Sequence, residues 1–256
     1  MEWTDEAIVL SARPHGENAA VVTLLTAAHG RHAGLMAGGQ GSRAQPILQA
    51  GNRVKAVWRA RLPEQLGHFT LDLVTSTAAA WLDVPEILTI IASASAVTEA
   101  SLPERQPMPG LYAGLATLFS LRDADLWGPA YVKWEMGLLQ ALGYGLDLSR
   151  CAASGVEENL TYVSPRTGRA VSKEAGLPYQ EKLFPLPSFL LGFGAWDAED
   201  IAKGLDLTGH FLSRHVFAHP HSRLLIATPG DLPQARHRLA EHYRNMCERD
   251  AERAAG

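Results

Sequence analysis

Basic side chains gather in one stretch near the start of this sequence. Between residues 10 and 62 seven residues are basic and only Glu17 is acidic, which gives a local charge of +6. Such a surplus can bind a phosphate backbone without regard to base sequence. A solvated surface that happens to lack acids accounts for it equally well. The candidate phosphate contacts are Arg13, Arg31, Arg43, Lys55, Arg59 and Arg61.

The overall composition hides this surplus. The 256 residues include 23 basic and 27 acidic side chains, a formal charge of −4, so the rest of the chain carries about −10. With 46% hydrophobic residues the chain can bury a large core, which excludes a disordered chain, a collagen and a coiled-coil rod. The longest central apolar run, residues 87–97, is about half the ~20 residues of a membrane span, and we expect no membrane contact.

Cysteine content and the first residues bear on the compartment. Cys151 and Cys247 are the two cysteines, too few for a disulfide scaffold, which indicates a reducing environment. The first six residues are acidic where a signal peptide would be basic. We therefore expect a cytoplasmic protein.

Catalytic motifs are missing from the sequence. It contains neither a Gly-x-Ser-x-Gly elbow nor a His-Glu-x-x-His zinc motif. Four histidines gather near the end of one predicted helix, and the i, i+4 spacing of two of them could hold a metal. No Asp, Glu or Cys lies among them, which favours histidines placed at a helix end over a ligand set. The four are His210, His215, His219 and His221.

A loop-rich region, residues 149–187, begins near Cys151 and is of the type that often holds a zinc ribbon. A zinc site there needs Cys-x-x-Cys and a second pair downstream. Residue 154 is Ser, however, and no Cys or His occurs between residues 152 and 208. We predict no metal or other cofactor, Cys151 as a buried small residue or an idle thiol, and a loop held by packing. The predicted packing residues are Tyr162, Val163, Val171, Leu177 and Tyr179.

The elements that would position the cations are β-strands. Residues 7–12 and 20–26 are apolar runs joined by turn residues, which predicts a hairpin. Further strands are predicted at residues 30–37, 54–61 and 68–77, the last with Phe69, Leu71 and Leu73 on one side. Five short strands in about 75 residues predict a small closed β-barrel.

Alternation in residues 54–61 bears on how a nucleic acid would bind. Lys55 and Arg59 alternate with Ala56 and Trp58, so one face is largely apolar and the other basic. Trp58 could stack on a base, but its register with Ala56 favours the barrel interior. The Gly-rich residues 38–46 form a long loop that carries Arg43 and lacks the Lys-Ser/Thr ending of a phosphate-cradling loop.

The pattern becomes helical after residue 80. Helices are predicted to open at Pro85, Pro109 and Pro129, the last of these closed by Gly143. Another helix begins at an Asp197 N-cap and the last one at residue 231.

Several segments in order resemble the RecO family of bacterial recombination mediators. They are residues 6–10, 16–18 and 25–30, then residues 133–144 with Asp147, Leu148 and Cys151, and finally residues 162–172 and 232–236. The resemblance runs from about residue 5 to 245. It departs from the family at the zinc loop, where many members carry four cysteines and this chain keeps only the first.

The resemblance implies an α+β chain. Residues 1–80 would be an OB-fold DNA-binding β-barrel, followed by a mostly α-helical C-terminal domain, residues 81–256, with a degenerate zinc-ribbon-like loop at about 149–187. It implies a nucleoid-associated protein of the bacterial cytoplasm that binds single- and double-stranded DNA and anneals strands without catalysis. The implied partners are RecR, the C-terminal tail of single-stranded-DNA-binding protein (SSB) and, indirectly, RecA. The alternative is an adaptor whose barrel contacts another protein.

Overall fold

The computed structural model describes residues 1–218 and 228–255. Within them the chain forms two compact units. The first contains residues 1–124 and 233–236, and the second contains residues 125–218, 228–232 and 237–255. The sequence predicted a boundary after residue 80, between a barrel domain and a helical domain. The two compact units do not test that boundary, so it stays a prediction.

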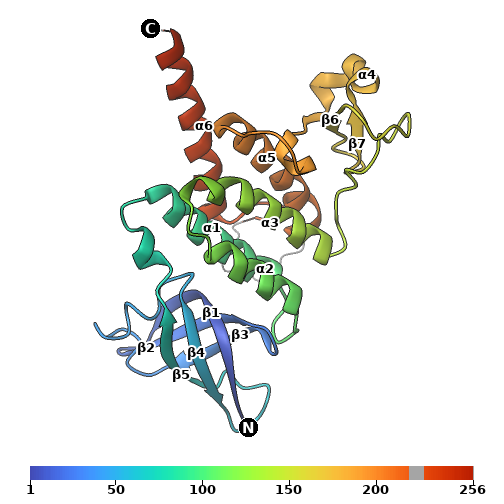
Figure 1. The fold of residues 1–256 in the computed structure, drawn as a ribbon. Helices are drawn as coiled ribbons and strands as arrows, with labels where there is room; N and C mark the ends of the chain where they lie inside the picture. Colours follow the sequence, from blue (N-terminus) through green and yellow to red (C-terminus); the bar gives the residue numbers. More distant parts are fainter. Residues whose placement is uncertain (219–227, 256) are drawn as a thin grey trace. The chain divides into compact units, whose positions relative to one another are not determined.

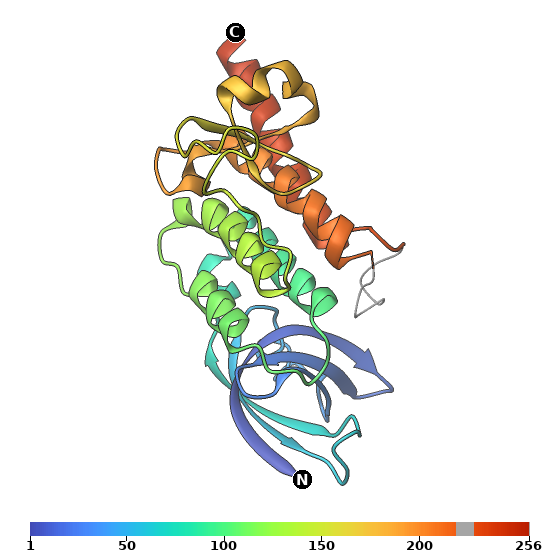
Figure 2. The same ribbon diagram turned by 90° about the vertical axis from the view of Figure 1, so that its right-hand side faces the viewer.

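Five strands of the first unit close into a barrel, in the order β1-β2-β3-β5-β4 (Figure 1). Neighbouring strands are antiparallel except β3 and β5, whose short parallel contact pairs Leu35 with His68. Figure 2 shows the same five strands curling round a common interior. The predicted five-stranded, OB-like barrel is confirmed. Its strands are β1 (Glu2–His15), β2 (Ala19–Thr26), β3 (Gly30–Met36), β4 (Arg53–Arg59) and β5 (His68–Thr75).

Two aromatic rings fill the barrel interior. Trp58 is 2% and Phe69 4% exposed, and both pack among small and branched apolar residues of the other strands. The indole nitrogen of Trp58 donates to the Leu66 carbonyl at 3.0 Å, which satisfies its one polar group. A Cβ at Gly34 would overlap the Phe69 ring, and one at Gly67 would overlap Trp58, so glycine is needed at both positions. The prediction that Trp58 is scaffold is confirmed.

Phe69, Leu71 and Leu73 of β5 pair with Trp58, Ala56 and Val54, the buried residues of β4, which agrees with the prediction that they share one side of the strand. Phe69 and Leu71 are buried, but Leu73 is 41% exposed. The pairing joins Val54 to Leu73 and Arg53 to Thr75, so Val74 is an extra residue in the ladder. This bulge ends the regular alternation after Leu73, which a period-2 pattern cannot show.

His32 of β3 is buried inside an aromatic cluster. Its ring meets those of Trp3, Trp58 and Phe69 edge to face, with centroids 4.9 to 6.1 Å apart. His32 is 4% exposed, and neither ring nitrogen has a hydrogen-bond partner within the described residues. Burial, with smaller contributions from Arg105 and His29, lowers the pKa of His32 to about 4. The ring is therefore neutral at pH 7.

Two helices complete the first unit: α1 (Pro85–Ser101) and α2 (Pro109–Phe119). Each starts at a proline, as predicted, because the missing N–H is not needed in the first turn. The chain after α1 passes close to the β2–β3 turn, where a Cβ on Gly30 would overlap the backbone oxygen of Gln106.

Three longer helices belong wholly or mainly to the second unit: α3 (Trp127–Ala141), α5 (Ala198–Phe211) and α6 (Gln234–Ala255). The Asp197 carboxylate accepts from the Asp200 amide at 2.9 Å, so the predicted N-cap is confirmed. Gly143, with φ of +88°, follows the end of α3 as predicted. Two predicted starts are wrong. The helix α3 begins two residues before Pro129, and α6 begins three residues after Asp231.

The loop-rich region contains a small sheet that was not predicted. Strands β6 (Leu160–Val163), β7 (Ala170–Ser172) and β8 (Phe184–Pro185) pair in the order β7-β6-β8, and the four-residue helix α4 (Lys173–Gly176) follows β7. Val163 and Val171 are buried, as predicted for packing residues. Leu177 and Tyr179 are 56% and 62% exposed, so the packing role predicted for them is wrong.

The buried His32 predicts a specific acid sensitivity. The unfolded chain takes up this proton near pH 6.5 and the folded chain only near pH 4, so stability falls as the pH falls through that window. The full shift corresponds to a loss on the order of 3 kcal/mol. We expect the free energy of unfolding, measured with urea, to fall less between pH 7 and pH 4.5 for His32→Phe than for the unsubstituted chain. His68→Gln, at an exposed position, is the control, and an equal acid loss in the His32 variant would contradict the prediction.

The close contact at Gly30 predicts that replacing two glycines of similar φ with alanine lowers the free energy of unfolding by different amounts. Gly16 and Gly30 have φ of +59° and +65°, but only Gly30 faces a neighbouring backbone atom. Gly16→Ala should cost about 1 kcal/mol, the penalty of the left-handed conformation alone. Gly30→Ala should cost clearly more, because the backbone near Gln106 must also move. Chemical denaturation measures both, and equal losses would show that the contact is not constraining.

Candidate nucleic-acid interface

The cations of β4 point outward because the inward positions of this strand are apolar. Val54, Ala56 and Trp58 are buried, while Lys55 and Arg59 are exposed and Arg53 is partly exposed. The alternation predicted for this strand is therefore confirmed. It brings Arg53, Lys55 and Arg59 to the outer surface of the barrel.

Acidic residues of the neighbouring strands lie beside these cations. Arg59 donates to Glu2 at 2.8 Å and Arg53 donates to Glu6 at 2.6 Å. Lys55 stands between Glu6 of β1 and Asp72 of β5 in the strand pairing. The hydrogen bond from Arg59 lowers the pKa of Glu2, so this pair is fully charged at pH 7. The outer face of β4 is thus mixed in charge.

This pairing changes the meaning of the +6 surplus. The surplus counts only residues 10–62, and the acids that face the cations lie outside that range. From Met1 to Thr77 the chain has seven basic and six acidic residues. Local charge therefore identifies which cations are present but not which of them are available to a ligand.

Two of the six predicted contacts hold α1 and its following residues against the barrel. The Arg31 side chain is buried, donates to the Leu102 carbonyl at 2.8 Å and lies 3.4 Å from Glu104. Burial lowers the pKa of Arg31, but an arginine stays charged at pH 7. Arg13, whose side chain is 35% exposed, donates to the buried Glu99 of α1 at 2.8 Å. These geometries assign a structural role to both residues.

Arg43 and Arg61 are exposed and make no ion pair within the described part of the chain. Arg43 lies in the β3–β4 connection, which hydrogen bonds such as Ala44 N–H to Gly41 O at 3.0 Å fold into successive turns. Arg61 lies in the β4–β5 connection. Of the six predicted contacts, Arg43, Lys55 and Arg61 are exposed and form no ion pair with a carboxylate of the described residues.

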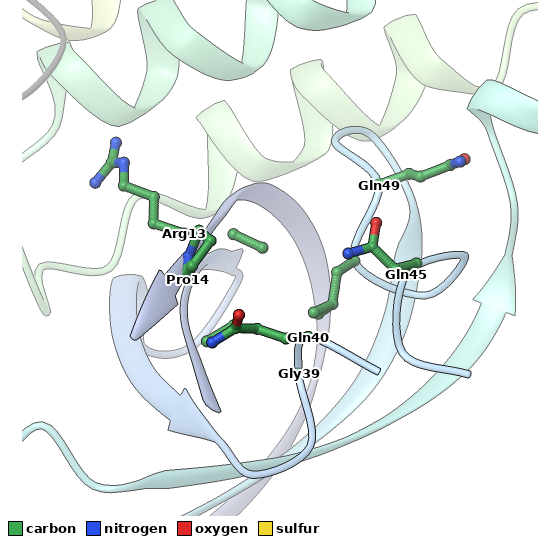
Figure 3. A pocket seen from close by; sticks show the side chains of 9 residues that line it. Arg13, Pro14, Gly39, Gln40, Gln45 and Gln49 are labelled. Atoms are coloured by element: carbon green, nitrogen blue, oxygen red, sulfur yellow. The ribbon is translucent and has the colours of Figure 1, made fainter. Parts of the chain in front are cut away.

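A hollow of about 250 Å³ opens between the β1–β2 hairpin and the Arg43 loop (Figure 3). Gln40 donates to the carbonyls of Gly16 and Ala19, both at 2.9 Å, which fixes its amide and leaves its oxygen free to accept. Figure 3 shows Gln40 and Gln45 facing the hollow, whereas the Arg13 guanidinium and the Gln49 amide point away from it. The hollow is therefore lined by amide groups and by apolar side chains such as Leu48, next to the loop that carries Arg43.

Aromatic side chains at the barrel surface are few. Trp58 and Phe69 are interior and unavailable for base stacking. The sequence prediction missed Trp3, which stacks on His29 with centroids 4.1 Å apart. His29 also lies 3.3 Å from Asp5, and its side chain is 32% exposed. No short-range signal marks this pair, because residues 3 and 29 meet only through strand pairing.

The region around Cys151 does not fit a zinc ion. Cys151 is 1% exposed, and its sulfur accepts from the Ser154 amide at 3.5 Å. Burial raises the pKa of the Cys151 thiol, but hydrogen bonds from Ser154 and Ser172 outweigh it and lower the pKa to about 6. Within the described ranges, no three His, Cys, Asp or Glu side chains are grouped as metal ligands would be. Hydrogen-bonded turns such as Cys151 N–H to Val156 O, at 2.7 Å, hold the loop instead.

The histidine group is only partly described. His219 and His221 lie outside the described residues. His210 contacts the Pro165 carbonyl through Nε2 at 3.1 Å, and His215 stacks on Tyr144 with centroids 5.0 Å apart. Both side chains therefore have packing partners.

Among the described helices, none combines the length and apolar character needed to cross a bilayer.

Comparisons with known proteins cover nearly the whole chain. Residues 1–76 match the family model described as Recombination protein O N terminal, and residues 83–224 match Recombination protein O C terminal. The chain is 52% identical to the DNA repair protein RecO of Rhodospirillum centenum, covering 95% of each chain. It is 45% identical to that of Rhodospirillum rubrum, over 98% of this chain and 99% of the relative. It is 49% identical to the DNA repair protein RecO of Caulobacter vibrioides, over 85% of this chain and 90% of the relative.

Both family models match in order, and the close relatives are covered almost from end to end. The order of a barrel followed by a mostly helical region agrees with the two models. The chain belongs to the RecO family of DNA repair and recombination proteins, which are non-enzymatic recombination mediators.

Proposed function

We propose that this chain is a DNA-binding recombination mediator that binds single- and double-stranded DNA through its barrel. The observation that carries the proposal is the exposure of Arg43, Lys55 and Arg61 on a small closed barrel, none of them held in an ion pair within the described residues. Closed barrels of this size commonly bind single strands with their loops and outer strands. Arg13 and Arg31 were predicted as contacts but are left out, because both are committed to α1 and the residues that follow it.

The contacts would be mainly to phosphates. Arg43 and Arg61 are exposed loop cations, and cations of this kind neutralise a backbone without reading bases. Arg59 is a weaker candidate because Glu2 holds its guanidinium at 2.8 Å. The hollow beside the Arg43 loop offers amide groups and apolar side chains, and the Arg13 guanidinium points away from it, which suits an uncharged part of a bound strand.

Membership in the family supports the wider role. The proposed activities are annealing of complementary strands and, together with RecR, loading of RecA onto strands coated by SSB. An acidic and hydrophobic SSB tail would need an apolar groove with a basic rim. Residues 1–80 as the DNA-binding domain, residues 81–256 as the helical domain, and a cytoplasmic, nucleoid-associated location belong to the same proposal.

A second candidate is a protein-interaction adaptor, and the mixed charge of the β4 face favours it. Alternating Glu2, Arg59, Glu6 and Lys55 could be matched by a protein partner with the opposite pattern. Nuclease-treated protein separates the two functions. A DNA mediator should bind added oligonucleotide after this treatment, and an adaptor should not.

If the contacts are to phosphates, the affinity for DNA should depend on salt concentration, and Arg43 and Arg61 should account for part of that dependence. For a single-stranded oligonucleotide, log K should fall linearly with log salt concentration. Arg43→Glu combined with Arg61→Glu should weaken binding to all sequences alike and lower the steepness of that slope by about 1.4, or about 0.7 per lost contact. Fluorescence anisotropy at several salt concentrations measures both quantities.

A matched control removes the same charge elsewhere. Arg249→Glu with Arg253→Glu changes two arginines near the end of α6, where the Arg253 side chain is 82% exposed. Its effect should be much smaller than that of the loop variant. A flat salt dependence of the unsubstituted chain, or equal effects of the two double variants, would rule out the proposed interface.

A further inference from the structure

A second, smaller pocket of the first unit brings together two arginines from distant parts of the sequence. Its volume is about 70 Å³, and its lining includes Arg53 at the start of β4, Ser76 just after β5, and Arg122 just after α2. Neither arginine is among the phosphate contacts predicted from the sequence. They lie 69 positions apart, and no local pattern relates them.

The charge balance of this pocket is positive. Arg53 is paired with Glu6 through one terminal nitrogen, but its Nε is buried and has no hydrogen-bond partner within the described residues. Arg122 is exposed and makes no ion pair in the part of the chain that the structure describes. The pocket lining includes no carboxylate, and Asp123, the acid next to Arg122 in sequence, is not part of it. A buried guanidinium N–H without an acceptor is costly, so an acceptor at this place would be favourable.

The size and the donors of the pocket point to one class of ligand. Arginine presents its N–H groups as a planar fork that matches the oxygens of phosphate or carboxylate. Within the described residues, Arg53 contributes its unpartnered Nε–H and Arg122 its unpaired guanidinium to the lining of this pocket. The volume is too small for a base or a sugar with its base, and it suits a single tetrahedral oxyanion. The Ser76 hydroxyl, which makes no hydrogen bond of its own within the described residues, adds another donor.

Arg122 has a competing structural explanation. It follows the C-terminus of α2, where a cation is favoured by the helix dipole. That role predicts an effect of Arg122 on stability alone. It predicts no effect on anion binding and does not explain the unpartnered Nε of Arg53.

We propose that the pocket between Arg53 and Arg122 binds one phosphate group, supplied by the backbone of bound DNA. This statement rests on the proposed DNA binding for the source of the phosphate, but not for the existence of the anion site. The two guanidinium groups would clamp phosphate oxygens and add one backbone contact to those of Arg43 and Arg61. Free inorganic phosphate has the same chemistry and is the other source that the experiment separates.

The test uses the full chain, Arg122→Gln, and the control Arg150→Gln, which removes one charge from an exposed residue of the second unit. In the first arm, thermal unfolding is measured in sodium phosphate and in sodium chloride at equal ionic strength. Phosphate stabilises folded chains without a specific site as well, so the expected result is a difference: it should raise the melting temperature of the unsubstituted chain and of the control more than that of Arg122→Gln. An Arg122→Lys variant keeps the charge at the end of α2 and loses the fork, so it should keep the stability in chloride and lose most of the phosphate effect.

In the second arm, the affinity for a single-stranded oligonucleotide is measured against salt concentration. Arg122→Gln should weaken binding about tenfold and lower the steepness of the salt slope by about 0.7, and the control should change neither. A phosphate effect without any change in oligonucleotide binding would overturn DNA as the source and leave a site for free phosphate. No difference between Arg122→Gln and the control in either arm would overturn the site itself. If the unsubstituted chain binds no oligonucleotide, the proposed function fails, and the first arm still decides the anion site.

Discussion

The filled interior of the barrel is the constraint on which the rest of the first unit depends. Trp58 and Phe69 occupy the space inside five short strands, and glycines at positions 34 and 67 allow their rings to fit. Because successive strand residues point to opposite sides, filling the interior with apolar side chains sends every cation of β4 outward. Ligand contacts must therefore come from the outer face and the loops, not from inside the barrel.

Charge pairing then decides which outward cations are available. The first strand supplies Glu2 and Glu6 beside Arg59 and Arg53, and the buried Glu99 of α1 takes Arg13. These pairs make the barrel surface nearly neutral while holding strands and helix together. The cations left unpaired within the described residues lie mostly on connections between elements, where a flexible ligand can reach them. A weakly charged barrel is thus compatible with DNA binding if a few loop cations do the binding.

Contacts within the chain stabilise the loop-rich region of the second unit. They include backbone hydrogen bonds of the turn around Cys151, a three-stranded sheet and the buried Val163. The thiol of Cys151 keeps hydrogen bonds from serine residues, one of them at the position that a second cysteine ligand would occupy. Serine offers no thiolate, and packing and hydrogen bonds hold this region together.

Features that depend on near neighbours along the chain could be predicted from the sequence alone. Period-2 alternation placed Trp58 inside, turn residues marked the β1–β2 hairpin, Asp197 capped α5, and ordered motifs indicated the family. The roles of the cations, in contrast, depend on tertiary contacts. Arg31 is buried and donates to the Leu102 carbonyl, and Arg59 pairs with Glu2. Arg53 and Arg122 line the same pocket. The physical reason is that a charge acts on whatever lies within a few ångströms, and in this fold those neighbours come from strands and helices that the sequence separates by tens of residues.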